Sequence, residues 1–309
     1  MFDAERTDLE PPRAPWVESP RLDDHLNAIH ADEELRSFAT ALARDGLAII
    51  DFDDARTSGL IDGAVRETDG YFTGGVTRVQ DTWRRSPAVR ALAVHPKVMR
   101  LLQGAYGRRP FAFQTLNFQR GSQQSLHSDA FHFHSQPERF MCGVWFALED
   151  VHAEAGPLTY HKGSHRLAIL TPQEAGVKPQ RGGGDDYAKA YVPALTKRME
   201  AAQAPAETAL LKKGQALVWA ANLAHGGAPV LDPNATRRSL VTHVFFEDCL
   251  YHTPMAGSAS GDRLRLRLPW NVATGGWVWP RHNGRPAVIR PQLFAISVLE
   301  RLLNKPLKF

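Results

Sequence analysis

Two histidines and one aspartate have the side-chain types and the spacing of a metal site. His127 and Asp129 are separated by one residue, and His225 lies far downstream. Residues two apart in a strand point to the same side, so His127 and Asp129 can reach one ion together. Two imidazoles and one carboxylate form a ligand set that holds Fe(II) by one face and leaves the other positions open for oxygen and substrates.

A His-X-Asp tripeptide is weak evidence alone, because many other histidines compete with this set. The competitors are His132, His134, His152, His161, His165, His243 and His252. The strongest of them is the segment His132-Phe133-His134, which shows the same spacing. A closed site made only of histidines would favour zinc or copper. Taken alone, the residue types leave these alternatives open.

A change in hydrophobic periodicity separates a helical part of the chain from a strand-rich part. We expect a helix over 32–44, a buried strand over 46–51 and a further helix from Pro87 to Gly104. From residue 111 the period changes to two, and strands are expected over 111–118, 139–148, 216–220 and 239–246. Short strands between Gly/Pro turns predict a β-barrel or jelly roll. His127 and Asp129 would then follow the first of these strands, and His225 the third.

We expect one domain over residues 1–309. Residues 1–107 would form a helical support, residues 108–250 the β core and residues 251–309 a C-terminal extension. The polar stretch 172–206 is expected to leave the core as an insertion or lid. Residues 291–303 are predicted to form an amphipathic helix that packs on the core or forms the seam of a homodimer.

The composition excludes several classes of protein. Apolar residues make up 43% of the chain, enough for a sizeable core, yet no apolar run is long enough to span a membrane. The first residues carry acids and no apolar segment typical of a secretory signal. Cys142 and Cys249 lack metal-binding spacing and suit a reducing compartment, so we expect a cytoplasmic location. The net charge of +4 accompanies no nucleic-acid-binding motif, so no nucleic acid is expected as a partner.

The motifs around the three candidate ligands resemble the phytanoyl-CoA dioxygenase family. In order, they are His127-Ser128-Asp129, Gly156-Pro157-Leu158, Gly163-Ser164-His165, His225-Gly226-Gly227 and Arg237-Arg238-Ser239. The resemblance implies a mainly β, cupin-like double-stranded β-helix, or jelly roll. The helical patterns described above would flank it with α-helices from the N-terminal region and with a C-terminal helix. It also implies an oxygenase that uses Fe(II), O2 and 2-oxoglutarate, hydroxylates a small-molecule substrate and releases succinate and CO2.

The same resemblance assigns roles to individual residues. His127, Asp129 and His225 would hold the iron. Arg237 would bind the far carboxylate of 2-oxoglutarate through two parallel hydrogen bonds, while Arg238 would face the opposite side as a surface charge. Because Asp129 is present, oxygen transfer is expected, and not the halogenation found in relatives that have a small residue at this position.

One departure from the family concerns the position two residues after the distal histidine. The family usually has a serine there that contacts the cosubstrate, whereas this chain has Gly227. Thr115, Asn117 and Trp145 are the candidates that would complete the 2-oxoglutarate pocket in its place.

The substrate is expected to lie next to the residues that follow the His-X-Asp motif. Phe131, His132 and His134 would line the mouth of the pocket, or alternatively form barrel wall. Two other functions remain open. One is a β-helix protein that binds a metal or a sugar without turnover. The other is a metallohydrolase that uses the same three ligands, with Arg237 on a substrate phosphate.

Overall fold

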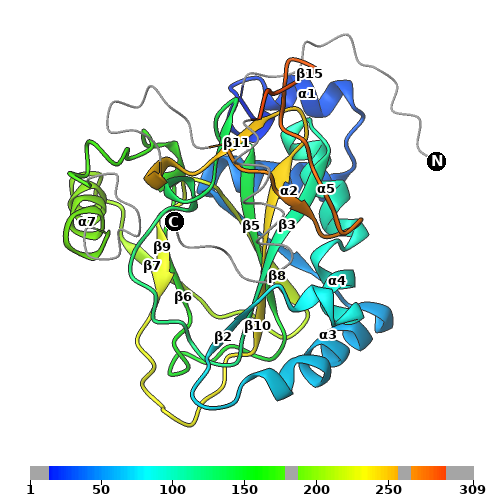
Figure 1. Cartoon of the computed structure of the whole chain (residues 1–309), viewed down its shortest axis with the longest axis vertical. Coiled ribbons are helices and arrows are strands. Elements are labelled where there is room, and N and C mark those ends of the chain that lie inside the picture. Colours follow the sequence, from blue (N-terminus) through cyan, green and yellow to red (C-terminus); the bar gives the residue numbers. More distant parts are fainter. Residues whose placement is uncertain (1–13, 178–186, 257–265, 290–309) are drawn as a thin grey trace.

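Two antiparallel sheets face each other at the centre of the protein, in a computed structural model that describes residues 14–177, 187–256 and 266–289 (Figure 1). The larger sheet has the strand order β1 (Leu47–Asp51), β8 (Gln215–Ala220), β5 (Met141–Ala147), β10 (Ser239–Phe246), β3 (Pro110–Phe118) and β2 (Arg78–Gln80). The smaller sheet has the order β7 (Ala206–Ala209), β6 (Leu158–His161) and β9 (His225–Gly227). This arrangement is the expected jelly roll.

Helices of the N-terminal part cover the outer face of the larger sheet (Figure 1). They are α1 (Leu22–Ala28), α2 (Glu33–Asp45), α3 (Ala55–Thr68), α4 (Pro87–Ala93) and α5 (Pro96–Tyr106). The predicted helix over 32–44 is confirmed as α2. The Asp32 side chain accepts a hydrogen bond from the Leu35 backbone N–H at its start, and Gly46 ends it with φ of +80°.

The prediction of a single helix from Pro87 to Gly104 is wrong. The structure has two helices there, because the chain leaves helical geometry at Val94 and His95 before Pro96 starts α5. Proline has no N–H to donate and its ring collides with the preceding turn, so it is accepted only at the start of a helix. Ser86 starts α4 by accepting a hydrogen bond from the Val89 N–H.

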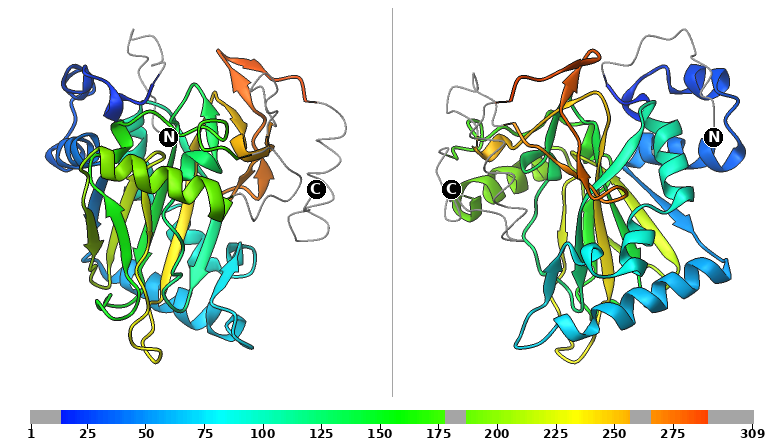
Figure 2. Two further views of the ribbon diagram at one scale, coloured as in Figure 1. Left: turned by 90° about the vertical axis from the view of Figure 1, so that its left-hand side faces the viewer. Right: turned by 45° about the vertical axis from the view of Figure 1, so that its right-hand side comes forward.

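Within the predicted insertion over 172–206, a π-helical turn (Tyr187–Tyr191) leads into α7 (Val192–Ala201). This helix lies beside the smaller sheet (Figures 1 and 2). Leu195 and Met199 of α7 belong to an apolar cluster that also contains Phe131 and Ala224. The helix is therefore packed next to the segments that carry the candidate metal ligands.

The C-terminal part adds short strand pairs to one end of the sheets (Figure 2). They are β11 (Leu250–His252) with β4 (His134–Gln136), β12 (Trp270–Asn271) with β13 (Gly276–Trp277), and β14 (Arg281–His282) with β15 (Arg285–Pro286). The remaining short elements are 3-10 turns over Trp16–Glu18, Asp69–Tyr71, Thr82–Arg84, Asp129–Phe131, Ser164–Arg166 and Pro254–Ala256. The predicted helix over 291–303 lies outside the described residues.

The pairing register of β3 and β10 decides which side chains face the space between the sheets. Gln114, Leu116 and Phe118 of β3 stand opposite His243, Val241 and Ser239 of β10. Directly opposed residues point to the same face of a sheet. The alternate residues point to the helices, where Leu240 and Val144 join the main apolar core. None of the helices in the described part of the chain has the length and apolar character needed to span a bilayer.

Candidate metal centre

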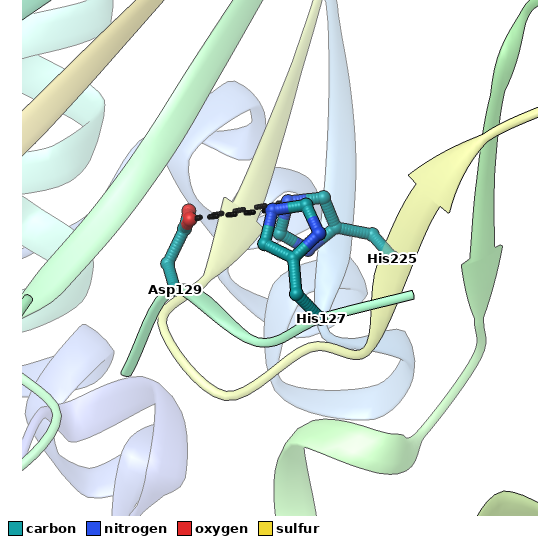
Figure 3. A group of neighbouring side chains, drawn as sticks. All are labelled: His127, Asp129 and His225. Carbon is teal, nitrogen blue, oxygen red and sulfur yellow. Dashed lines mark ion pairs between the residues drawn. The ribbon is translucent and has the colours of Figure 1, made fainter. Parts of the chain in front are cut away.

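The three predicted ligands, far apart in sequence, meet between the two sheets (Figure 3). One ligand atom from each of His127, Asp129 and His225 lies within 4.8 Å of the others, and all three residues are buried. The Asp129 Oδ1 atom is 3.9 Å from His127 Nε2 and 4.0 Å from His225 Nε2. Among the described residues, no other group of three or more His, Cys, Asp or Glu side chains lies close enough together to hold one ion. His132 and His134 therefore form no competing site.

Backbone pairing brings the two histidines together. The His127 N–H donates to the His225 carbonyl, and the His225 N–H donates to the His127 carbonyl, both at 2.8 Å. The chain after His225 also passes very close to the segment before His127. A Cβ at Gly226 would lie 2.9 Å from the Gln124 carbonyl oxygen, so a residue without a side chain is needed there.

Backbone carbonyls orient both imidazole rings. The Nδ1 atoms of His127 and His225 lie 2.9 Å from the carbonyl oxygens of Ser125 and Leu223, respectively. A carbonyl only accepts, so each Nδ1 carries the proton and each Nε2 keeps its lone pair for a metal. Burial and the neighbouring His225 lower the pKa of His127 to about 3, which keeps this ring neutral at pH 7.

The carboxylate of Asp129 is held by a tryptophan that sequence analysis missed. The Trp219 indole N–H donates to Asp129 Oδ2 at 2.7 Å, and His243 Nε2 lies 3.7 Å from the same oxygen. Burial by itself would raise the pKa of Asp129, but the surrounding imidazoles and the indole N–H lower it to about 2. Gly143 makes room for this arrangement, because a Cβ there would lie 2.2 Å from the Trp219 ring.

A cavity of about 270 Å³ adjoins the three ligands. Its charged lining residues are Asp129, Arg237 and Arg78. Its polar lining includes Gln124, whose amide nitrogen lies 3.1 Å from His127 Nε2. An ion bound to that nitrogen therefore requires the Gln124 side chain to move aside.

Arg237 and Arg238 lie in opposite environments, as the alternation of a strand predicts. Arg237 lines the cavity, is only 3% exposed, and its guanidinium lies 5.3 Å from the centre of the Trp145 ring. No ion pair or hydrogen bond of its side chain occurs within the described residues, and its buried Nε has no partner. Burial lowers its pKa to about 10, so it stays charged at pH 7. Arg238 instead pairs with Asp69 and Glu149 on the outer side.

The structure corrects the placement of Thr115 and Asn117. Both side chains lie on the helix-facing side of β3, and neither lines the cavity. The Asn117 side-chain oxygen accepts a hydrogen bond from the Thr82 hydroxyl at 2.5 Å. The prediction chose the wrong phase of the strand: the residues that reach the cavity are Gln114, Leu116 and Phe118. Trp145, the third candidate, does line it.

A hydroxyl from another segment lies against Gly227. The Oγ of Ser122 lies 2.9 Å from the position that a Cβ at residue 227 would take, and Ser122 lines the cavity. The hydroxyl that the family usually carries at this position is therefore matched in space by a residue before the His-X-Asp motif. The substitution of Gly227 for serine hid this residue from sequence reasoning.

Of the three residues predicted to meet a substrate, one lines the cavity. His132 does so, and its Nε2 lies 3.4 Å from the Tyr187 hydroxyl. Phe131 instead stacks on Tyr191, with ring centres 3.8 Å apart. His134 lies on β4 opposite His252 of β11, outside this cavity. The prediction rested on the position of these residues directly after the His-X-Asp motif, but the 3-10 turn over Asp129–Phe131 and the pairing of β4 with β11 direct Phe131 and His134 away from the cavity.

Comparisons with known proteins agree with the resemblance seen in the sequence. The sequence model of the family described as phytanoyl-CoA dioxygenase (PhyH) matches residues 55–239, more than half of the chain. No curated protein sequence matches.

Among solved structures, the non-heme alpha ketoglutarate dependent epimerase SnoN from nogalamycin biosynthesis is similar, with 21% identity, a TM-score of 0.55 and coverage of 83% of this chain and 96% of SnoN. EctD from S. alaskensis has 16% identity, a TM-score of 0.54 and coverage of 85% and 87%. The carbocyclase SnoK, also from nogalamycin biosynthesis, has 14% identity, a TM-score of 0.54 and coverage of 73% and 88%. These likenesses confirm the jelly-roll fold.

Proposed function

Because the chain belongs to the phytanoyl-CoA dioxygenase family, we propose that it is an oxygenase that uses Fe(II) and 2-oxoglutarate to hydroxylate a small molecule. The observation that carries this proposal is the buried, unpaired Arg237 in the same cavity as His127, Asp129 and His225. A buried guanidinium without a partner is costly, so its position points to an anionic ligand that the cavity binds.

The donor set fits iron. His127 and His225 offer neutral imidazole nitrogens, and Asp129 offers one carboxylate oxygen, which together leave part of the coordination sphere open. Trp219 occupies the other carboxylate oxygen, so Asp129 would ligate through Oδ1 alone. A single-oxygen ligand leaves more positions free for cosubstrate and oxygen than a bidentate carboxylate would.

The cavity also fits 2-oxoglutarate. Arg237 would fork onto the far carboxylate of the cosubstrate, because a guanidinium matches a carboxylate with two parallel hydrogen bonds. The Ser122 hydroxyl is the further donor, in place of the usual serine at position 227. Phe118 and Trp145 stand on either side as an apolar wall that excludes water from this salt bridge.

With both groups bound, Fe(II) and 2-oxoglutarate would activate O2 and transfer one oxygen atom to a substrate C–H bond, with release of succinate and CO2. The protein's own residues orient the ligands, exclude water and position the substrate on the side of His132 and Phe133. The cavity volume of about 270 Å³ suits a small molecule.

The test is succinate formation. Protein purified without oxygen is given Fe(II), 2-oxoglutarate and air, and succinate is compared with that of a His127→Ala variant. Slow turnover without the true substrate should give succinate above this control. A hydrolase or a non-catalytic binding protein with the same three ligands would give none, and that result would contradict the proposal.

A further inference from the structure

Two polar side chains on the edge strand β2 point into the cavity. Arg78 stands opposite Phe118, and Gln80 stands opposite Leu116. Phe118 and Leu116 face the cavity, and directly opposed residues share a face, so the register aims Arg78 and Gln80 at the same space. Both residues are among its lining residues and are exposed to solvent, which places them at its mouth.

Arg78 has no counter-ion in the part of the chain that the structure describes. In residues 14–177, 187–256 and 266–289 it makes no ion pair and its side chain makes no hydrogen bond. Among the described residues, Asp129 is the only acid that lines the cavity, and Trp219 and the surrounding imidazoles already engage it. Arg78 therefore differs from Arg238, whose charge two nearby carboxylates balance.

The charges of the proposed complex balance without Arg78. Fe(II) carries two positive charges and Arg237 one, while Asp129 carries one negative charge and 2-oxoglutarate two, so these groups balance among themselves. The positive charge of Arg78 has no part in that balance. A negatively charged group on the substrate would give Arg78 its counter-ion.

We propose that the substrate of this oxygenase carries an anionic group, a carboxylate or a phosphate, that Arg78 binds at the mouth of the cavity. The Gln80 amide, one of whose protons goes to Asp81, offers its other proton as a second donor. The inference rests on the proposed function and goes beyond it by naming the substrate class.

The register also places Arg78 within the cavity. Phe118, opposite Arg78, is four residues along β3 from Gln114. Gln114 in turn contacts His243, which lies beside Asp129. Four residues span about 13 Å of a strand. Arg78 therefore lies at the Phe118 end of the cavity, and the substrate would extend from there toward the side of His132 and Phe133.

Three probes of similar shape test the charge requirement: phenyl phosphate, benzoate and the neutral benzamide. Each is titrated calorimetrically into full-length protein loaded with Fe(II) and 2-oxoglutarate without oxygen. The visible band of the iron–cosubstrate complex is recorded in the same samples. The variants are Arg78→Gln, Arg78→Lys and, as a matched control, Arg85→Gln, which removes an exposed arginine outside the cavity.

Wild-type protein should bind at least one anionic probe about tenfold or more tightly than benzamide, because a hydrogen bond to a charged group is worth about 1.5–3 kcal/mol. Arg78→Gln should lose this preference, Arg78→Lys should keep part of it, and Arg85→Gln should keep it all. Tighter binding of phenyl phosphate would identify a phosphate, and tighter binding of benzoate a carboxylate.

Three results would overturn the inference: no preference for an anionic probe in wild-type protein, unchanged probe affinity in Arg78→Gln, or loss of the visible band in Arg78→Gln. The last would assign Arg78 to the cosubstrate. Absence of the band in wild-type protein is a different result, because it would refute the proposed function itself.

Discussion

The two faces of the larger sheet both bury polar side chains, but only one of them is built for a ligand. On the helix-facing side, Thr115, Thr242 and Asn117 lie in the packed core under the N-terminal helices. On the cavity-facing side, the same two strands and the segment just before β10 present Gln114, His243 and Arg237. Strand alternation alone separates the two sets.

Unpaired buried atoms occur on both faces, so they do not mark the site by themselves. The hydroxyls of Thr115 and Thr242 have no hydrogen-bond partner in the described residues, and neither has Arg237 Nε. A neutral hydroxyl left unpaired costs about 1–3 kcal/mol, which packing can offset, whereas an unpaired buried charge costs far more. The charge, together with a cavity in front of it, distinguishes the functional face.

The two adjacent arginines, which face opposite sides, should show the largest difference in 2-oxoglutarate binding. Arg237→Gln should weaken 2-oxoglutarate binding about 100-fold, since it removes a charged partner in a water-poor place. Arg238→Gln should change it less than about twofold, because its ion pairs are partly exposed and weak. Titration of 2-oxoglutarate into the anaerobic Fe(II) protein measures the affinity of both variants. A larger loss of affinity in Arg238→Gln than in Arg237→Gln would refute the assigned register.

Trp219 offers the next largest effect. Trp219→Phe keeps most of the ring but removes the hydrogen bond to Asp129, and should weaken Fe(II) binding about 10- to 100-fold. Trp83→Phe is the matched control on the helix side, where the Trp83 indole N–H donates to Asp81. Chelator competition gives both dissociation constants. Equal losses in the two variants would show that the effect comes from packing and not from the carboxylate.

Ser122 should give a smaller change. Ser122→Ala removes the hydroxyl next to Gly227 and is expected to weaken 2-oxoglutarate binding about three- to tenfold, the worth of one ordinary hydrogen bond. Thr242→Val deletes a hydroxyl on the helix-facing side and serves as the control for hydroxyl loss. If Ser122→Ala changes the affinity for 2-oxoglutarate no more than Thr242→Val does, Ser122 has no role in binding the cosubstrate.

Thr115→Val is expected to have the smallest effect on the binding of 2-oxoglutarate. This nearly isosteric change removes an unpaired buried hydroxyl and should raise the free energy of unfolding by about 1 kcal/mol. The affinity for 2-oxoglutarate should not change, because Thr115 does not reach the cavity. Urea unfolding and the same titration measure the two quantities. A loss of affinity would place Thr115 back in the pocket.

The sequence predicted the parts of the site that local spacing determines. His127 and Asp129 lie close together in the chain, and Arg237 follows His225 at the family's distance. The phase of β3 was not predictable, because Gln114-Thr115-Leu116-Asn117 places polar residues on both faces. Only the pairing with β10 decides which of them reach the cavity.

Contacts between segments that are far apart in the chain could not be predicted from the sequence either. Trp219 reaches Asp129 because β5 and β8 pair so that Gly143 stands opposite Trp219, and only the sheet reveals this register. Ser122 meets Gly227 across two segments that are far apart in the chain. The break at Pro96, in contrast, was readable, since proline is poorly tolerated inside a helix. The single-domain organisation over 1–309 stays a prediction.

The central claim is that His127, Asp129, His225 and Arg237 together bind Fe(II) and 2-oxoglutarate in one cavity. The most direct measurement is the visible spectrum of the wild-type protein without oxygen, as 2-oxoglutarate is added after Fe(II). A band that saturates with 2-oxoglutarate, is absent in Asp129→Ala, and requires far more 2-oxoglutarate in Arg237→Gln is the predicted result. A wild-type protein that binds Fe(II) yet shows no such band would contradict the account.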